Sequence, residues 1–424
     1  MSRKMKDSGI EWIGEIPEDW EVSRIKNYLK RNEPRNPGDK IVLSLYRDLG
    51  IVPKDSRDDN HNVTSLDTSN YKYVCIGDFV INKMKAWQGS VAVSDYEGIV
   101  SPAYYVYNFT DSTFVKKYFH YLLRNCYKDE FRRLSGGIRE GQWDLSSENF
   151  DTTLVIIPDK ISQTAIAAYL DRQCTHIDNI IEKTKTSIEE YKKLKQAVIT
   201  QAVTKGIRGN REMKDSGIEW IGEIPVEWEI TRIKNYCKLI TGGTPSTNNQ
   251  LWFNGDIEWF TPGDFLDNYW LENSKRKLSQ KALEEQVAVY VKKGTVLIVG
   301  IGATAGKVGI TAKDSSFNQQ ITALVSESIN SKYLLYWLEI NKGFIRETAN
   351  YTTLPIINNQ TLGQYVLIIP RNKDEQQEIA AYLDQKCSEI DAIITKKQQF
   401  ITEMENYKKS LIFECVTGKR EVSV

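Results

Sequence analysis

The chain has 424 residues, enough for two to four domains, and its 41% hydrophobic and 26% charged residues are ordinary for a soluble globular protein. The formal net charge is zero, which argues against nucleic-acid binding over the whole surface and leaves room for local basic patches. No apolar run reaches the roughly 18 residues of a membrane span, no signal segment opens the chain, and the six cysteines form no Cys-x-x-Cys pair. These features predict a cytoplasmic protein that does not enter a membrane.

The chain begins with a motif that it repeats almost unchanged. Met5–Tyr28 and Met213–Tyr236 differ at four positions, and both contain Gly-Ile-Glu-Trp-Ile-Gly-Glu-Ile-Pro. The glycine and proline spacing predicts turns, and the tryptophans and isoleucines are expected to pack inside a domain. A contact with a partner protein is the alternative role of this motif.

Between the first motif and residue 158, apolar and polar residues alternate in the sequence, which is typical of β-strands. We expect strands at Tyr71–Ile81 and Pro102–Tyr107, a helix at Ser112–Leu134 and a final strand at Thr153–Ile157. The second motif is followed by the same plan, with strands near 288–299, 308–311, 321–325 and 366–369 and a helix near Ser331–Thr348. One scaffold with two sets of diverged loops predicts two different binding specificities.

Each of these globular parts is followed by a long helical segment. Ile166–Thr204 and Ile379–Thr417 align without a gap at an offset of 213 residues, and neither contains proline or glycine. Apolar residues occupy most positions of two series with a seven-residue period, which is typical of a coiled-coil seam. We therefore expect the segments to pair through eight seam residues: Leu170, Ile177, Ile181, Ile188, Leu383, Ile390, Ile394 and Ile401.

The order of the repeats predicts an α+β protein with a pseudo-twofold. Two similar domains with mixed β-sheets and helices, residues 1–158 and 213–370, would be separated by two long antiparallel coiled-coil helices within residues 159–212 and 371–424. Because a second motif follows the first helix, the end of the second helix should meet the first motif. This circular order places the two chain termini near each other.

Several apparent catalytic motifs fail on their spacing. Gly300–Lys307 resembles a phosphate-binding loop, but Val308 stands where serine or threonine must bind magnesium. The three histidines are scattered and predict no metal site, and no adjacent prolines form a DNA methyltransferase pocket. The chain is therefore expected to bind rather than to catalyse.

Two basic or polar regions of the first domain are candidates for DNA binding. Lys116–Arg139 carries seven cationic and two acidic side chains and leads into a glycine-containing loop, although a solvated helix face and a turn would look the same. Arginine and glutamine can read base edges through paired hydrogen bonds. The candidates in this domain are Lys83, Lys85, Gln88, Arg132, Arg133, Arg139 and Gln142.

The candidate loops of the second domain are less charged and rich in hydroxyl and amide groups, which suit both phosphates and bases. The candidates there are Thr244, Ser246, Thr304, Lys307, Gln319, Thr352 and Thr353.

These motifs in this order resemble the specificity subunit of type I restriction–modification enzymes. The matching text includes the duplicated Gly9–Pro17 motif, Gly242–Ser246, Ile257–Asp264 and the helices that begin Gln-x-x-Ile-Ala-Ala-Tyr-Leu-Asp at Gln163 and Gln376. The resemblance covers essentially the whole chain. It rests on the order and duplication of the motifs, since no single one is decisive.

The resemblance implies two target-recognition domains, each reading one half of a bipartite, asymmetric site in double-stranded DNA, with the helical pair setting the gap and docking partner subunits. The chain itself would have no catalytic residues and no cofactor. Two modification subunits with S-adenosylmethionine and two restriction subunits with ATP and Mg²⁺ would make the assembly a DNA adenine methyltransferase and an ATP-dependent endonuclease. A coiled-coil scaffold that binds no DNA and a self-sufficient DNA enzyme are the alternatives.

Overall fold

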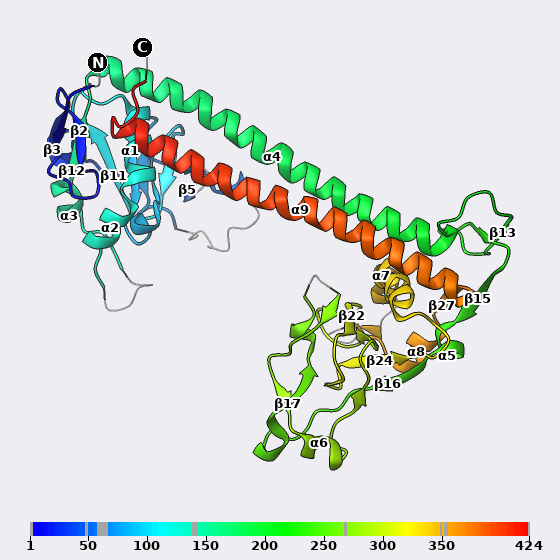
Figure 1. Ribbon diagram of the computed structural model, residues 1–424. Helices are drawn as coiled ribbons and strands as arrows, with labels where there is room; N and C mark the ends of the chain where they lie inside the picture. The colour runs from blue at the N-terminus through cyan, green and yellow to red at the C-terminus, as the bar shows by residue number, and fades with distance from the viewer. Residues whose placement is uncertain are drawn as a thin grey trace. The chain divides into compact units, whose positions relative to one another are not determined.

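The structure is a computed structural model that describes residues 3–46, 50–56, 67–137, 143–266, 269–347, 350–351 and 355–422. The chain forms two compact units: Met1–Lys185 with Gln398–Val424, and Thr186–Lys397. Each unit contains one globular domain and part of both long helices, α4 (Lys160–Lys205) and α9 (Lys373–Val416) (Figure 1). The predicted α+β class with two similar domains and two long helices is confirmed.

The first unit is built around an antiparallel sheet in the order β4-β11-β8-β9. Its strands are β4 (Leu29–Arg31), β11 (Tyr104–Phe109), β8 (Phe79–Asn82) and β9 (Val91–Val93). Smaller pairs join β1 (Met5–Asp7) to β2 (Glu15–Pro17), β3 (Glu21–Arg24) to β12 (Leu154–Ile157), β5 (Leu43–Tyr46) to β6 (Gly50–Pro53) and β7 (Lys72–Val74) to β10 (Gly98–Val100). The helices are α1 (Lys116–Cys126), α2 (Lys128–Leu134) and α3 (Ser147–Thr152).

Two predicted elements of the first unit are divided in the structure. The strand predicted at Tyr71–Ile81 is β7 and β8, which belong to different sheets because the chain turns at Gly77, whose φ is +88°. The helix predicted at Ser112–Leu134 is α1 and α2. Tyr127, with φ −92° and ψ 9°, interrupts it, and its buried hydroxyl donates to the Leu154 carbonyl at 2.8 Å.

The second unit repeats this arrangement with an additional edge strand. Its sheet has the order β16-β24-β21-β22-β18, formed by β16 (Lys238–Thr241), β24 (Ile321–Val325), β21 (Val296–Val299), β22 (Val308–Thr311) and β18 (Trp270–Leu271). A second sheet has the order β19-β17-β23-β20, formed by β19 (Lys277–Leu278), β17 (Phe253–Phe260), β23 (Ser315–Phe317) and β20 (Tyr290–Val291). The predicted strand near 288–299 is thus two strands, β20 and β21, separated by a turn at Gly294, whose φ is +82°.

The remaining elements of the second unit complete the correspondence with the first. The pairs are β13 (Met213–Asp215) with β14 (Glu223–Pro225), β15 (Trp228–Arg232) with β27 (Val366–Pro370), and β25 (Asn350–Tyr351) with β26 (Pro355–Ile356). The helices are α5 (Ile233–Tyr236), α6 (Gln280–Glu284), α7 (Ser331–Glu347) and α8 (Asn359–Gln364). The predicted helix near Ser331–Thr348 is α7, so the shared plan of the two domains is confirmed.

Both long helices begin earlier than the heptad pattern predicts, because side chains cap them. The Asp159 carboxylate accepts from the backbone N–H groups of Ile161 and Ser162 at 2.9 and 3.0 Å, and the Asn372 amide oxygen accepts from Asp374 at 2.8 Å. A cap of this kind satisfies N–H groups that have no partner within the helix.

A glutamine near each helix start holds the helix to its domain. The Gln163 amide donates to the Pro158 carbonyl at 2.8 Å and accepts from the Val115 N–H at 2.7 Å. Gln376 repeats this with Pro370 at 2.9 Å and Asn330 at 2.8 Å. The glutamine of the repeated helix motif is therefore a buried structural bridge.

The helices run antiparallel within each unit. In the first unit, Asp178 on α4 pairs with Lys408 on α9 at 2.7 Å. In the second, Lys195 on α4 pairs with Asp391 on α9 at 2.6 Å. Asp178 and Asp391 are equivalent at the offset of 213 residues, and so are Lys195 and Lys408. The two ion pairs are therefore equivalent contacts, and the helices have the same register in both units.

Apolar residues fill the seam between the helices. In the first unit Leu170, Ile177 and Ile181 share a core with Leu411 and Cys415. In the second unit, the seam residues Ile188, Ile390 and Ile394 are buried. Leu383 shares a core with Ile199 and Val203 from α4. Ile401, in the first unit, is partly buried against the core of that unit.

The end of α9 packs against the first motif, as the circular order of the repeats predicts. The Lys419 ammonium donates to the Ile13 carbonyl at 2.7 Å. Lys205, at the end of α4, makes the matching bond to the Ile221 carbonyl of the second motif at 2.9 Å. Both described chain ends therefore lie in the first unit, close to each other (Figure 1).

Candidate nucleic-acid interface

Two loops of the second unit enclose a polar cavity of about 530 Å³. One loop follows β21 and supplies Thr304, and the other joins β23 to β24 and supplies Asn318, Gln319 and Gln320. Thr244, from the segment after β16, lines the cavity as well, together with Arg276 and with residues at the end of β17 and just after it. Three predicted residues, Thr244, Thr304 and Gln319, thus line the same cavity although they lie far apart in the sequence.

The corresponding loops of the first unit enclose a cavity of about 360 Å³. The segment after β8 supplies Met84 and Lys85, and the connection between β10 and β11 supplies Ser101 and Ala103. Since β8 occupies the position of β21, and β10 and β11 those of β23 and β24, the two cavities are equivalent sites of one scaffold.

The two cavities differ in the side chains that they present. In the first unit the polar lining includes Ser44, Lys54, Tyr71, Asn82, Lys85, Ser101 and Tyr104. In the second it includes Thr244, Thr261, Arg276, Thr304, Asn318, Gln319 and Gln320. Burial raises the pKa of the Tyr104 hydroxyl, so at neutral pH this group remains a neutral hydrogen-bonding group. The same backbone position therefore offers different donors and acceptors in the two units.

Backbone turns hold the polar groups of the second cavity in place. The Asn318 side chain is buried, donates to the Gln320 amide oxygen at 3.0 Å and accepts from the Gln320 N–H at 3.1 Å. Gly302, in the opposite loop, has a φ of +112°, which favours glycine over residues with a side chain. Fixed polar groups, and the missing side chain at Gly302, allow another molecule to approach closely.

Of the described candidates in the first unit, Lys85 lines the first cavity, whereas Lys83, Gln88, Arg132 and Arg133 do not. The Lys83 ammonium pairs with the Asp144 carboxylate at 3.1 Å. Asp144 comes directly after the glycine-containing loop that the sequence analysis singled out. Arg132 lies 5.9 Å from the centres of both the Trp87 and Trp143 rings. Gln88 ends a short 3-10 helix, Ala86–Gln88. Arg139 and Gln142 lie outside the described residues, and their role stays a prediction.

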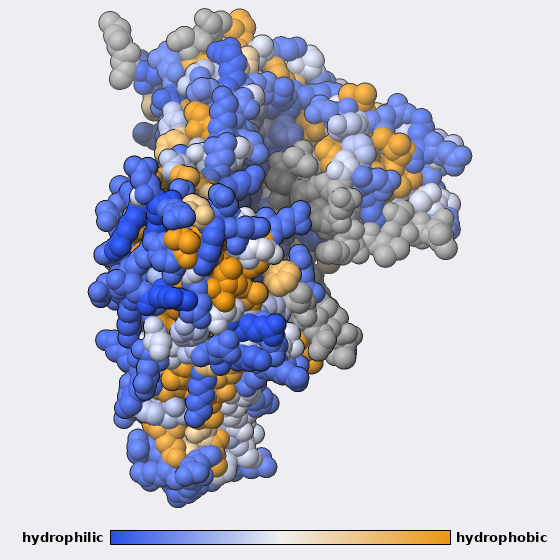
Figure 2. All heavy atoms as spheres, turned by 90° about the vertical axis from the view of Figure 1, so that its right-hand side faces the viewer, coloured by the Kyte–Doolittle hydropathy of each residue, from blue (hydrophilic) through white to orange (hydrophobic). Residues whose placement is uncertain are grey.

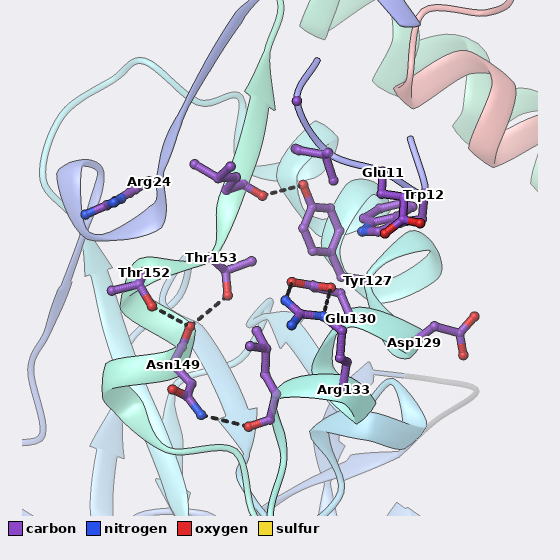
Figure 3. A pocket seen from close by; sticks show the side chains of 14 residues that line it. Glu11, Trp12, Arg24, Tyr127, Asp129, Glu130, Arg133, Asn149, Thr152 and Thr153 are labelled. Atoms are coloured by element: carbon purple, nitrogen blue, oxygen red, sulfur yellow. Dashed lines mark hydrogen bonds and ion pairs between the residues drawn. The ribbon is translucent and has the colours of Figure 1, made fainter. Parts of the chain in front are cut away.

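Arg133 lines a different cavity, of about 810 Å³, beside the first motif (Figure 3). Its guanidinium donates to both carboxylate oxygens of Glu130, at 2.9 and 2.6 Å. Trp12 of the motif lies nearby, with its ring centre 4.8 Å from that of Tyr127. Arg133 thus has an acidic partner within its own helix, whereas Lys85 faces the loop cavity.

Two further predicted residues of the second unit are described. The Lys307 ammonium donates to the Phe265 carbonyl at 3.2 Å, and the Ser246 hydroxyl accepts from the Asn248 N–H at 3.4 Å. Thr352 and Thr353 lie outside the described residues. A role in DNA binding remains a prediction for each of the candidate residues.

Sequence reasoning missed Arg276 as a cavity residue. It singled out the amide groups of the loop at Asn318–Gln320, although it named only Gln319 among the candidate residues. No motif marks Arg276, and only the pairing of β19 with β17 brings it to the cavity wall.

The face of the molecule drawn in Figure 2 is mainly hydrophilic. Hydrophobic side chains form separate groups on the face drawn in Figure 2. Among the described residues, no helix has the length and apolar character required to cross a membrane. Within the same residues, no three His, Cys, Asp or Glu side chains gather into a group able to hold a metal ion.

Two equivalent domains with differently lined cavities, joined through a shared helical pair, define a class of modular recognition proteins. The chain belongs to the family described as type I restriction modification DNA specificity domain, whose model matches residues 17–190 and 225–403. Its role is therefore that of a DNA specificity subunit in a type I restriction–modification system, and the alternative of a scaffold that binds no DNA is not favoured.

Individual relatives agree with this assignment. The putative type I restriction enzyme MjaX specificity subunit of Methanocaldococcus jannaschii is 24% identical over 97% of this chain and 96% of its own length. The MjaIX specificity subunit of the same organism is 29% identical over 45% of this chain and 44% of its own length.

Solved structures share the fold. A chain from a study of complex assembly and conformational transition of the type I R-M system has a TM-score of 0.75 at 15% identity, covering 96% of this chain and 99% of that one. The HsdS subunit from Thermoanaerobacter tengcongensis has a TM-score of 0.55 at 15% identity, covering 96% and 98%.

Proposed function

We propose that each loop cavity reads one half of a bipartite, asymmetric site in double-stranded DNA. The observation that carries this proposal is the pair of cavities at equivalent positions with different polar linings. Base edges in the major groove present a distinct pattern of donors and acceptors for every base pair. Two different linings on one scaffold therefore suit two different half-sites.

The helical pair sets the gap between the half-sites. Each long helix is continuous and belongs partly to each unit, so its length is a fixed structural quantity. An α-helix rises about 1.5 Å per residue, so adding or removing residues changes this length in defined steps. The proposed domain boundaries are 1–158, 159–212, 213–370 and 371–424.

The helical pair also docks the modification subunits. Leu194 on α4, in the second unit, and Tyr407 on α9, in the first, are 48% and 46% exposed, and they are equivalent at the offset of 213 residues. An exposed apolar side chain on an otherwise charged helix is suited to a protein interface. Two equivalent surfaces support two modification subunits, and two restriction subunits complete the proposed assembly.

The chemistry belongs to the partner subunits. The modification subunits bind S-adenosylmethionine, and the restriction subunits bind ATP and Mg²⁺. The assembly acts in the cytoplasm as a DNA adenine methyltransferase and an ATP-dependent endonuclease. The present chain supplies recognition, without a catalytic residue or cofactor of its own.

A selection experiment tests this function. The chain is purified with its modification subunit and used to select duplexes from a library of random sequence. The proposal predicts enrichment of two short sequence blocks separated by a fixed gap. It also predicts methyl transfer by the complex and none by this chain alone. Enrichment of no sequence, or methyl transfer by the isolated chain, contradicts the proposal.

A further inference from the structure

Arg276 lies over two aromatic rings at the edge of the second cavity. Its guanidinium carbon is 4.7 Å from the centre of the Phe253 ring and 5.2 Å from that of Trp259. The two ring centres are 6.3 Å apart at an interplanar angle of 73°. A guanidinium above aromatic faces is held by cation–π attraction and keeps its N–H groups available at its edge.

The surface beneath Arg276 is rigidly supported. Trp259 is buried, and its indole N–H donates to the Gly243 carbonyl at 3.1 Å. The Arg276 carbonyl accepts from the Trp259 N–H at 3.3 Å and from the Ser274 hydroxyl at 2.6 Å. The backbone of Arg276 and one of the rings below it are therefore fixed by the pairing of β17 with β19.

A buried acidic residue reinforces the same strand pair. The Glu258 carboxylate accepts from the Ser274 N–H at 2.7 Å and pairs with the Lys277 ammonium at 2.9 Å. Burial by itself raises the pKa of Glu258, but these hydrogen bonds outweigh it and hold the pKa below its usual value. Glu258 stays ionised at neutral pH and takes Lys277, the residue after Arg276, as its partner.

Arg276 itself has no acidic partner among the described residues. Other arginines of the same unit are paired: Arg208 with Glu378, and Arg211 with Glu227 and Glu375. Arg276 is exposed, and of the described residues that line the cavity it is the charged one. An exposed cation whose N–H groups lack an acidic partner, at the rim of a polar cavity, is suited to an acceptor-rich ligand.

We propose that Arg276 determines specificity by reading a guanine in the half-site bound by the second unit, an inference that rests on the proposed function. The major-groove edge of guanine offers two acceptors, O6 and N7, at a spacing that matches two N–H groups of one guanidinium. The hydroxyl and amide groups of Thr244, Thr304 and Gln319 line the same cavity and are available for neighbouring bases.

Among the described residues that line the first cavity, there is no arginine. Its cavity has Lys54 and Lys85 as the cationic side chains among the described lining residues. A lysine ammonium is a point charge without the planar fork of arginine. The proposed guanine contact is therefore assigned to the half-site bound by the second unit, and its loss should leave the first half-site unchanged.

The test compares four forms of the complex with the modification subunit: the wild type, Arg276→Ala, Arg276→Lys and the control Arg208→Ala. Arg208 is an exposed arginine of the same unit outside the cavity, so its replacement removes the same charge. Each form selects duplexes from a random library, and affinities are then measured on the wild-type target and on variants with one base pair changed.

The proposal predicts that one guanine of one half-site becomes degenerate in both Arg276 variants. At that position, the preference for guanine over the other bases falls about 5- to 150-fold. The other half-site is unchanged, and the Arg208→Ala complex keeps the specificity of the wild type. Replacing that guanine by 7-deazaguanine, which lacks N7, weakens binding of the wild type and not of Arg276→Ala.

Three outcomes overturn the inference. Unchanged specificity in both Arg276 variants removes Arg276 from base reading while leaving the proposed function intact. A uniform loss of affinity for all sequences, with a smaller salt dependence and retained specificity, identifies a phosphate contact instead. If Arg276→Ala loses the base specificity and Arg276→Lys retains it fully, a positive charge at this position is sufficient and the paired N–H groups of arginine are not required. By contrast, a wild-type complex without any two-part specificity refutes the proposed function itself.

Discussion

Shortening the helical pair by one heptad should shorten the DNA gap. The deletion must remove opposite segments of the two helices. From Asp178 to Lys195 the chain advances 17 residues along α4, and their partners, Lys408 and Asp391, step back 17 residues along α9. Residues 183–189 are therefore opposite residues 397–403. Deleting both segments keeps both ion pairs and the heptad phase, since seven residues restore the seam with a rotation of about 20°.

The magnitude follows from helix and DNA geometry. Seven residues at about 1.5 Å each shorten the pair by about 10 Å. B-DNA repeats every ~34 Å in 10–10.5 base pairs, so about 10 Å corresponds to about three base pairs. We expect the unspecified gap to become about three base pairs shorter, or the complex to lose its target if the altered DNA twist cannot be accommodated.

Sequencing of methylated sites in a host that expresses the variant and the modification subunit measures the gap. A matched duplication of the same two heptads is the control, and it should shift the gap in the opposite direction. Each domain should remain folded, as judged by circular dichroism. Methylation of the original sequence with the original gap would refute the proposal that helix length sets the gap, and would require a flexible linkage between the domains.

Three predictions concern stability. Burial is the largest cause that lowers the pKa of His120 from 6.5 to about 4, and the charges of nearby Arg124 and Lys117 act in the same direction. The neutral imidazole of His120 therefore stabilises the folded protein above pH 6.5, and this stabilisation is lost as the pH falls towards 4. His120→Asn should remove about 2 kcal/mol of this acid sensitivity between pH 7 and pH 4.5, measured by urea unfolding of wild type and variant at both pH values; an equal loss of stability in the two proteins would contradict it. Leu170→Ala, at a fully buried seam position, should cost about 2–5 kcal/mol in urea unfolding of the first unit, whereas a cost below 1 kcal/mol would show that the seam is loosely packed. Lys408→Ala should cost less than about 1 kcal/mol because its ion pair with Asp178 is partly exposed, and a larger loss in thermal unfolding would show a role beyond this pair.

The sequence predicts the helices well because their pattern is local and sustained. From Leu170 onward, four of the five residues at heptad spacing are hydrophobic, with Thr184 as the exception, and the copy that starts at Leu383 repeats the period with Lys397 as its exception. The helix starts were less accurate, since caps such as Asp159 depend on one side chain outside the pattern. The interruption at Tyr127 was invisible because its cause is a hydrogen bond to Leu154, which is distant in sequence.

The cavities were only partly predictable. Thr304 and Gln319 lie in polar loops next to predicted strands, so strand order alone brings them together. Arg276 could not be found in this way, because its position over Phe253 and Trp259 depends on the register of β17 and β19. Arg133 was singled out by local charge, but Glu130 one helical turn away pairs with it.

Exchange of one domain tests the central claim most directly. Residues 27–157 lie between the first motif, which contacts the end of α9, and the start of α4, so they can be replaced by the equivalent segment of a relative with a different target. The methylated sites of a host expressing the chimera with the modification subunit are then sequenced. Two independently reading cavities predict one new half-site, an unchanged second half-site and an unchanged gap. A chimera that alters both half-sites, or neither, contradicts the account.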